Sequence, residues 1–132
     1  MQESNEQLLI LPPPSFSMMQ AEIIDYQEAK KSIIVKIPVL KDWVNPYNTM
    51  QGGLIEAAVD NAVGSLSLLS APVNITRNIE TKFVKAVTLE TTHIYVHARL
   101  CEQRKKRLTF EVTVQDENGE IFTKSKVINF IV

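Results

Sequence analysis

The sequence has little cysteine, and its charges nearly balance. Cys101 is the only cysteine among 132 residues, so an internal disulfide and a thiolate cluster for zinc are both excluded. The formal net charge is −1, so no global field favours binding to nucleic acid or to a membrane surface. We therefore expect neither kind of partner.

Long hydrophobic runs are also missing. No stretch approaches the ~20 apolar residues that cross a bilayer. The N-terminus has no basic start and only a short apolar run before three consecutive prolines, which does not fit a secretion signal. These features predict a cytoplasmic protein. Because proline cannot continue a helix or donate to a strand ladder, residues 1–18 are predicted to be an extended lead-in to one domain, residues 19–132.

Apolar residues make up 45% of the chain and charged residues 22%, a composition typical of a globular protein. Residues 21–26 and 32–39 are rich in isoleucine and valine and flank a polar turn, which predicts a hairpin. Four longer runs of strand-forming residues follow later: residues 73–84, 89–101, 107–115 and 120–132. Asn118-Gly119 separates the last two, and this dipeptide favours a hairpin turn.

Between the two groups of strands the apolar period changes to that of a helix. Leu54, Ala58, Ala62 and Leu66 lie on one face at ~100° per residue, and the opposite stripe carries Asp60. The segment 54–69 is apolar over most of its girth, which is typical of a buried helix. The order of two strands, a buried helix and four strands predicts an α+β fold, an antiparallel sheet wrapped around one long central helix.

The start of this helix and its carboxylate are the candidate site. Gly52-Gly53 would let another group approach the free amides of the first turn, where a developing oxyanion is stabilised. The alternative is a simple entry turn. Asp60 lies mid-helix among small residues, and an exposed structural aspartate is its alternative. Glu56, one turn earlier, is a rival on the same stripe, and periodicity does not choose between the two.

Residues 45–64, NPYNTMQGGLIEAAVDNAVG, resemble the signature of the PaaI-like branch of the hotdog thioesterases. That signature is an asparagine, then His-Gly-Gly, then an acidic residue nine places after the histidine. The strand order and the C-terminal Asn-Gly hairpin also resemble that family, from about residue 21 to the end. The resemblance implies a hotdog fold and an acyl-CoA thioesterase.

The resemblance also implies a role for each matching residue. Asp60 corresponds to the acidic nucleophile or general base, Gly52 to the amide that polarises the thioester carbonyl, and Asn45 to a group that positions water or carbonyl. Thr76 corresponds to a serine or threonine early in the next strand. Gln51 replaces the family histidine, and an amide cannot titrate near neutral pH. Activity would be retained if that histidine only orients groups and weakened if it shuttles protons.

Helix geometry adds a constraint that does not depend on the family. Gly52 and Asp60 are separated by about 12 Å along a helix, whereas attack requires roughly 3–3.5 Å between the reacting atoms. One helix therefore cannot bring both groups to one thioester. The site is predicted to lie at a dimer interface. The family resemblance adds that such dimers commonly assemble into tetramers.

Two other groupings are weighed for ligand binding. His93 and His97 alternate within a strand, where they lie about 13 Å apart, so they are not expected to share a metal. No metal or redox cofactor is expected, and coenzyme A enters as part of the substrate. The run Arg104, Lys105, Lys106, Arg107 is either a solvated hairpin tip or a contact for the phosphates of coenzyme A.

Three functions follow from these observations. The first is hydrolysis of an acyl- or aryl-acyl-CoA thioester. The second is an acyl-CoA-binding hotdog protein without turnover, in which the missing histidine marks lost activity. The third, a hotdog hydratase or dehydratase, is ranked last because such enzymes use a histidine near the helix, and the only histidines here lie on a distant strand.

Overall fold

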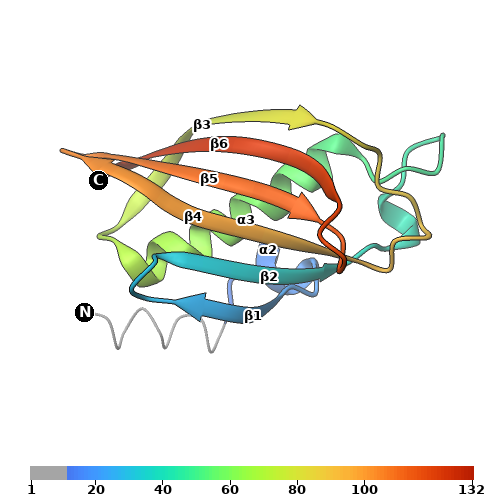
Figure 1. The fold of residues 1–132 in the computed structure, drawn as a ribbon, viewed down its shortest axis with the longest axis horizontal. Coiled ribbons are helices and arrows are strands. Elements are labelled where there is room, and N and C mark those ends of the chain that lie inside the picture. Colours follow the sequence, from blue (N-terminus) through green and yellow to red (C-terminus); the bar gives the residue numbers. More distant parts are fainter. Residues whose placement is uncertain (1–11) are drawn as a thin grey trace.

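The computed structural model describes residues 12–132, in which a curved antiparallel sheet wraps around one long helix (Figure 1). The six strands are ordered β1-β2-β4-β5-β6-β3. This confirms the predicted hotdog fold. The elements, in chain order, are α2 (Pro14–Met18), β1 (Glu22–Gln27), β2 (Ser32–Pro38), the 3-10 helix η1 (Lys41–Trp43), α3 (Gly52–Ser70), β3 (Asn74–Phe83), β4 (His93–Arg104), β5 (Arg107–Gln115) and β6 (Ile121–Ile131).

The core lies between α3 and the concave face of the sheet. Val59, Ala62 and Leu66 of α3 are fully buried, as are Val96 of β4 and Phe110 of β5. Along β2 and β4 every second residue is buried, because successive side chains of a strand point to opposite faces. The apolar surface of the helix thus packs against one apolar face of the sheet. Within residues 12–132, no helix has the length and hydropathy needed to cross a membrane.

The prediction of an extended lead-in is wrong for its described part. Pro14 begins the short helix α2, because the first residue of a helix needs no amide donor and proline already has a helical φ. Phe16 and Met19 are buried in the core, and the Ser15 hydroxyl donates to Asn61 Oδ1 of α3 at 3.0 Å. The rest of the predicted lead-in, residues 1–11, lies outside the described part of the chain.

The turns differ in detail from the sequence prediction. The basic turn is shorter than predicted, because β4 continues to Arg104 and β5 begins at Arg107, leaving Lys105 and Lys106 as the turn. Lys105 has a φ of 55°. The Asn-Gly hairpin is confirmed, with Gly119 at a φ of 87° and the Asp116 carboxylate accepting the amides of residues 118 and 120 at 2.9 Å.

Strand β3 is an edge of the sheet, and apolar side chains are exposed near both of its ends. It pairs with β6 on one side and with no strand of residues 12–132 on the other. Ile75, Phe83 and the adjoining Val84 are each about half exposed, at 56%, 52% and 53%. An unpaired strand edge with apolar side chains is a surface that readily pairs with another chain.

Candidate functional site

The first turn of α3 presents free backbone donors. Gln51 is the N-cap residue, and its carbonyl accepts the amides of Leu54 and Ile55 at 3.0 and 3.1 Å. Its side chain is exposed and makes no capping hydrogen bond. The amides of Gly52 and Gly53 have no hydrogen-bond acceptor within residues 12–132. The helix therefore begins with two donors at the positive end of its dipole.

Phe83, at the end of β3, lies against this helix start. A Cβ atom on Gly52 would meet the Phe83 ring at 3.3 and 3.4 Å, closer than ordinary van der Waals contact. The absence of a side chain at Gly52 therefore allows the ring to pack beside the free amide. Phe83 was not identified from the sequence, because its contact with α3 depends on how the sheet wraps the helix.

Asn45 is engaged in holding the loop before the helix. Its Oδ1 accepts the amides of Tyr47 and Thr49 at 2.9 and 3.2 Å, and its Nδ2 donates to Thr49 Oγ1 at 2.8 Å. These bonds fix the segment that leads into Gln51, and they leave one Nδ2 hydrogen. The structure thus places Asn45 as a residue that positions the loop at the helix start, and a direct contact with substrate stays a prediction.

Asp60 and Thr76 form the second part of the site. The Thr76 hydroxyl donates to Asp60 Oδ1 at 2.8 Å, so the residue matched only by resemblance lies in contact with the carboxylate. Both residues line a groove of about 390 Å³, together with Gly64, Ser67, Leu68, Ala71, Pro72, Val73, Asn74, Ile75 and Asn129. Glu56 is not among the lining residues. The groove therefore favours Asp60 over its rival.

Asn129 is a polar residue of the groove that sequence reasoning missed. It is the cross-strand partner of Thr76 and is only 2% exposed. Its Nδ2 donates to Asn74 Oδ1 at 2.8 Å, but its Oδ1 has no partner. The available signal was an asparagine within the apolar run Val127-Ile-Asn-Phe-Ile131. The register that places it opposite Thr76 could not be known.

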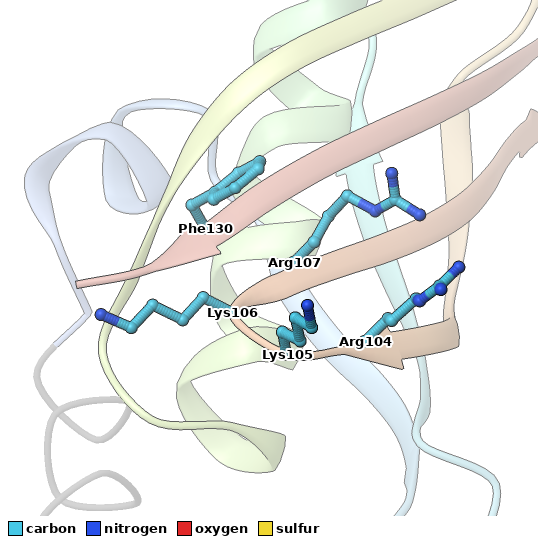
Figure 2. Close-up of a pocket in the computed structure, with 5 residues that line it drawn as sticks. All are labelled: Arg104, Lys105, Lys106, Arg107 and Phe130. Carbon is cyan, nitrogen blue, oxygen red and sulfur yellow. The ribbon is translucent and has the colours of Figure 1, made fainter.

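The basic turn borders a separate pocket on the outer face of the sheet. Figure 2 shows Arg104, Lys105, Lys106 and Arg107 around the β4–β5 turn, with Phe130 of β6 beside them. They line a pocket of about 580 Å³. Arg107 pairs with Glu102 at 3.1 Å. Phe130 was not foreseen from the sequence.

This basic pocket and the Asp60 groove lie at the same end of the sheet. Phe130 follows Asn129 directly on β6, so their side chains point to opposite faces. Arg107 is the cross-strand partner of Phe130. On its other side the Phe130 ring contacts the guanidinium of Arg77, 4.7 Å from the ring centroid. Aromatic and cationic groups therefore gather at the end of the sheet that holds the Asp60 groove, on the opposite face.

His93 and His97 both lie on β4, as the strand alternation predicted. His97 Nε2 is 3.0 Å from Gln115 Nε2, and burial lowers the pKa of the imidazole. Residues 12–132 contain no cluster of three or more His, Cys, Asp or Glu side chains that could hold a metal ion.

Comparison with known proteins gives one family match. The family described as "Thioesterase superfamily" matches residues 47–123, the span from the loop before α3 to β6. No curated protein matches the sequence.

Solved structures share the fold at low sequence identity. The Escherichia coli PaaI protein of the phenylacetic acid degradation operon superposes with a TM-score of 0.87 at 11% identity, covering 99% of this chain and 93% of that one. A putative thioesterase related to phenylacetic acid degradation from Ralstonia eutropha JMP134 gives 0.85 at 14%, covering 95% and 98%.

A third similar structure contains coenzyme A. It is a hypothetical thioesterase from Streptococcus pneumoniae TIGR4, with a TM-score of 0.80 at 16% identity, covering 100% of this chain and 97% of that one. Two further structures with the same description carry alanine in place of a threonine and of an aspartate. At these identities the likeness establishes the fold.

Proposed function

This chain belongs to the thioesterase superfamily, and we propose that it hydrolyses the thioester bond of an acyl-CoA. The observation that carries the proposal is the hydrogen bond from Thr76 to Asp60 within an open groove. This hydrogen bond orients Oδ1 of the Asp60 carboxylate, and Oδ2 is left to accept a proton. A carboxylate held in this way suits a general base.

The proposed reaction uses the two halves of the site. The thioester oxygen accepts a hydrogen bond from the Gly52 amide, and Asp60 takes a proton from the water that attacks the carbonyl carbon. The negative charge on the tetrahedral intermediate is stabilised at the helix start. The carbon–sulfur bond then breaks, and the leaving thiolate takes the proton from Asp60, giving the free acid and coenzyme A.

A parallel in a structural relative supports the pairing of Asp60 with Thr76. In the two Streptococcus pneumoniae variants the replaced aspartate and threonine are separated by the same number of positions as Asp60 and Thr76 are here. Each of these two side chains was replaced by alanine in a separate variant of that protein. We take the matching residue types and spacing as support for a joint role of this pair.

The site is proposed to form between two subunits. Gly52 and Asp60 lie on the same helix, about 12 Å apart. Edge strand β3 has Thr76 near its start and Phe83 at its end. If β3 pairs antiparallel with β3 of a second copy about a two-fold axis, the Asp60–Thr76 pair lies beside Phe83 and Gly52 of the partner subunit. We propose a homodimer on this edge, or a tetramer built from such dimers.

The basic pocket is proposed to bind the nucleotide end of coenzyme A. Arg104, Lys105, Lys106 and Arg107 supply cations for phosphate groups, and the Phe130 ring offers a face on which adenine can stack. Because this pocket lies at the same end of the sheet as the Asp60 groove, one extended ligand can reach both. The presence of coenzyme A in a structural relative supports the same ligand class.

A panel of acyl-CoAs assayed for released thiol tests the function. Saturable release above the uncatalysed rate is the expected result. Tight binding of acyl-CoA without thiol release would instead support the second candidate, which Gln51 in place of the family histidine favours. Hydration of an enoyl-CoA without thiol release would support a hydratase.

Neutralising the basic pocket should affect recognition of the coenzyme and leave the chemical step intact. We expect the double variant Arg104→Ala, Lys106→Ala to raise KM for an acyl-CoA by about tenfold, because each lost charge-assisted contact weakens binding. KM for the same acyl group on pantetheine, which lacks the nucleotide, should be unchanged. Lys36→Ala, on β2 away from the pocket, is the control. An equal loss on both substrates would contradict nucleotide binding here.

A further inference from the structure

The hydrogen bonds around Asn129 determine which atom of its side-chain amide is left unpaired. Asn74 Nδ2 donates to the Pro72 carbonyl at 2.7 Å, so Asn74 presents its Oδ1 to Asn129. Asn129 must meet that oxygen with its Nδ2, at 2.8 Å. The amide of Asn129 therefore cannot be reversed without losing this bond. Its Oδ1 remains a buried acceptor, without a hydrogen-bond partner among the described residues.

This acceptor lies in the same groove as the Asp60 carboxylate, with Thr76 in contact with the carboxylate and opposite Asn129. Asn129 and Thr76 are opposite each other on neighbouring strands, where facing side chains have Cβ atoms about 4.5–5.5 Å apart. Thr76 in turn contacts Asp60, and all three line the same groove. A buried acceptor without a donor lowers stability, unless a bound molecule supplies the donor. The Asp60 side chain in this groove is exposed to solvent, so water can reach it.

We propose that Asn129 Oδ1 holds the water molecule that Asp60 activates, an inference that rests on the proposed hydrolysis. Water has two hydrogens to donate, one to the free oxygen of Asp60 and one to Asn129 Oδ1. With both donated, a lone pair is directed away from the two acceptors and toward the thioester carbon. The oxygen–carbon bond then forms, Asp60 takes the first proton, and the carbonyl electron pair moves to the oxygen bound at Gly52 of the partner subunit.

Replacement of Asn129 by leucine, which is close in size, tests this role. We expect kcat for acyl-CoA hydrolysis to fall by roughly 10–100-fold, because the water is no longer oriented, while KM changes less than about twofold. The melting temperature should change little, because loss of the 2.8 Å bond to half-buried Asn74 is offset by replacing a buried unpaired oxygen with an apolar group. A loss of activity without a loss of stability is the signature of a role in the reaction.

Thr123 provides a matched control on the same strand. It is fully buried, and its Oγ1 likewise lacks a partner, but it does not line the groove. Thr123→Val should leave kcat unchanged. Asn129→Asp keeps an acceptor at the site but, when ionised, loses the donor to Asn74 Oδ1, so it should recover only part of the activity lost in Asn129→Leu. The second carboxylate should also move the acidic limb of the pH profile, along which activity rises as Asp60 loses its proton, to higher pH, because two neighbouring carboxylates resist ionising together.

Three outcomes would overturn the proposal, and the first two of them leave the proposed hydrolysis standing. An unchanged kcat in Asn129→Leu would exclude a water-holding role even though hydrolysis itself is established. A raised KM with unchanged kcat would show that Asn129 instead accepts an amide of the pantetheine arm. A wild-type protein that hydrolyses none of the acyl-CoAs would overturn this inference together with the proposed function.

Discussion

Replacing Asp60 with asparagine is expected to reduce kcat for acyl-CoA hydrolysis by about a thousandfold, within the range that loss of a general base produces. Asparagine has nearly the same shape and can still accept the Thr76 hydroxyl, so the 2.8 Å contact that orients the side chain is retained. What it loses is the ability to take a proton. Because Asp60 is exposed, the folded state should be little affected, and initial rates of thiol release report the chemistry directly.

Glu56→Gln is the matched control for this variant. Glu56 lies one turn earlier on the same helix, and the same change from carboxylate to amide is made there. Because Glu56 does not line the groove, its variant should retain full activity. Activity within tenfold of wild type in Asp60→Asn, or a loss in Glu56→Gln as large as that in Asp60→Asn, would contradict the assignment of the base.

The fold could be predicted because it depends on local periodicity. The alternation of buried residues in β2 and β4, and the apolar girth of α3, are both present in short stretches of sequence. The lead-in was misjudged at Pro14 because proline both ends helices and begins them. Its helix is specified by the packing of Phe16 against the core, which is not a local property.

The site was predictable only where it follows one element. The glycines and the aspartate occur on a single helix, so their separation could be calculated from the sequence. The contacts of Asn129, Phe130 and Phe83 depend instead on strand register and on the curvature of the sheet. Asn129 meets Asn74 across a separation of 55 positions, and no short pattern encodes such a pairing.

Gln51, which stands where the family has a histidine, contributes little to forming the helix start. Gln51 is exposed, and its side chain does not cap the helix, so the helix start is formed by the backbone without it. The substitution therefore costs the fold little. The amides of Gly52 and Gly53 and the Asp60–Thr76 pair are all still present, which is why we propose hydrolysis and not binding alone.

Gly52→Pro should lower kcat by about 10²–10³-fold, the effect of removing one oxyanion donor. Proline is well tolerated at the first position of a helix, and Gln51 has the extended conformation that a following proline requires, with φ −62° and ψ 134°. The substitution thus deletes one N–H at little cost to the backbone. Gly52→Ala is the control, since it adds the same Cβ against the Phe83 ring but retains the amide. Equal losses in the two variants would assign the effect to Phe83.

Pairing a Gly52→Pro chain with an Asp60→Asn chain in one dimer tests whether the site is shared between subunits. In a heterodimer of one Gly52→Pro chain and one Asp60→Asn chain, a shared site receives an intact amide from the second chain and an intact carboxylate from the first. The other site of the dimer lacks both groups. Two differently tagged chains, co-expressed and purified through both tags, should therefore recover about half of the wild-type activity per dimer. A site contained within one chain would give no recovery, because each chain lacks one of the two groups that must act on the same thioester.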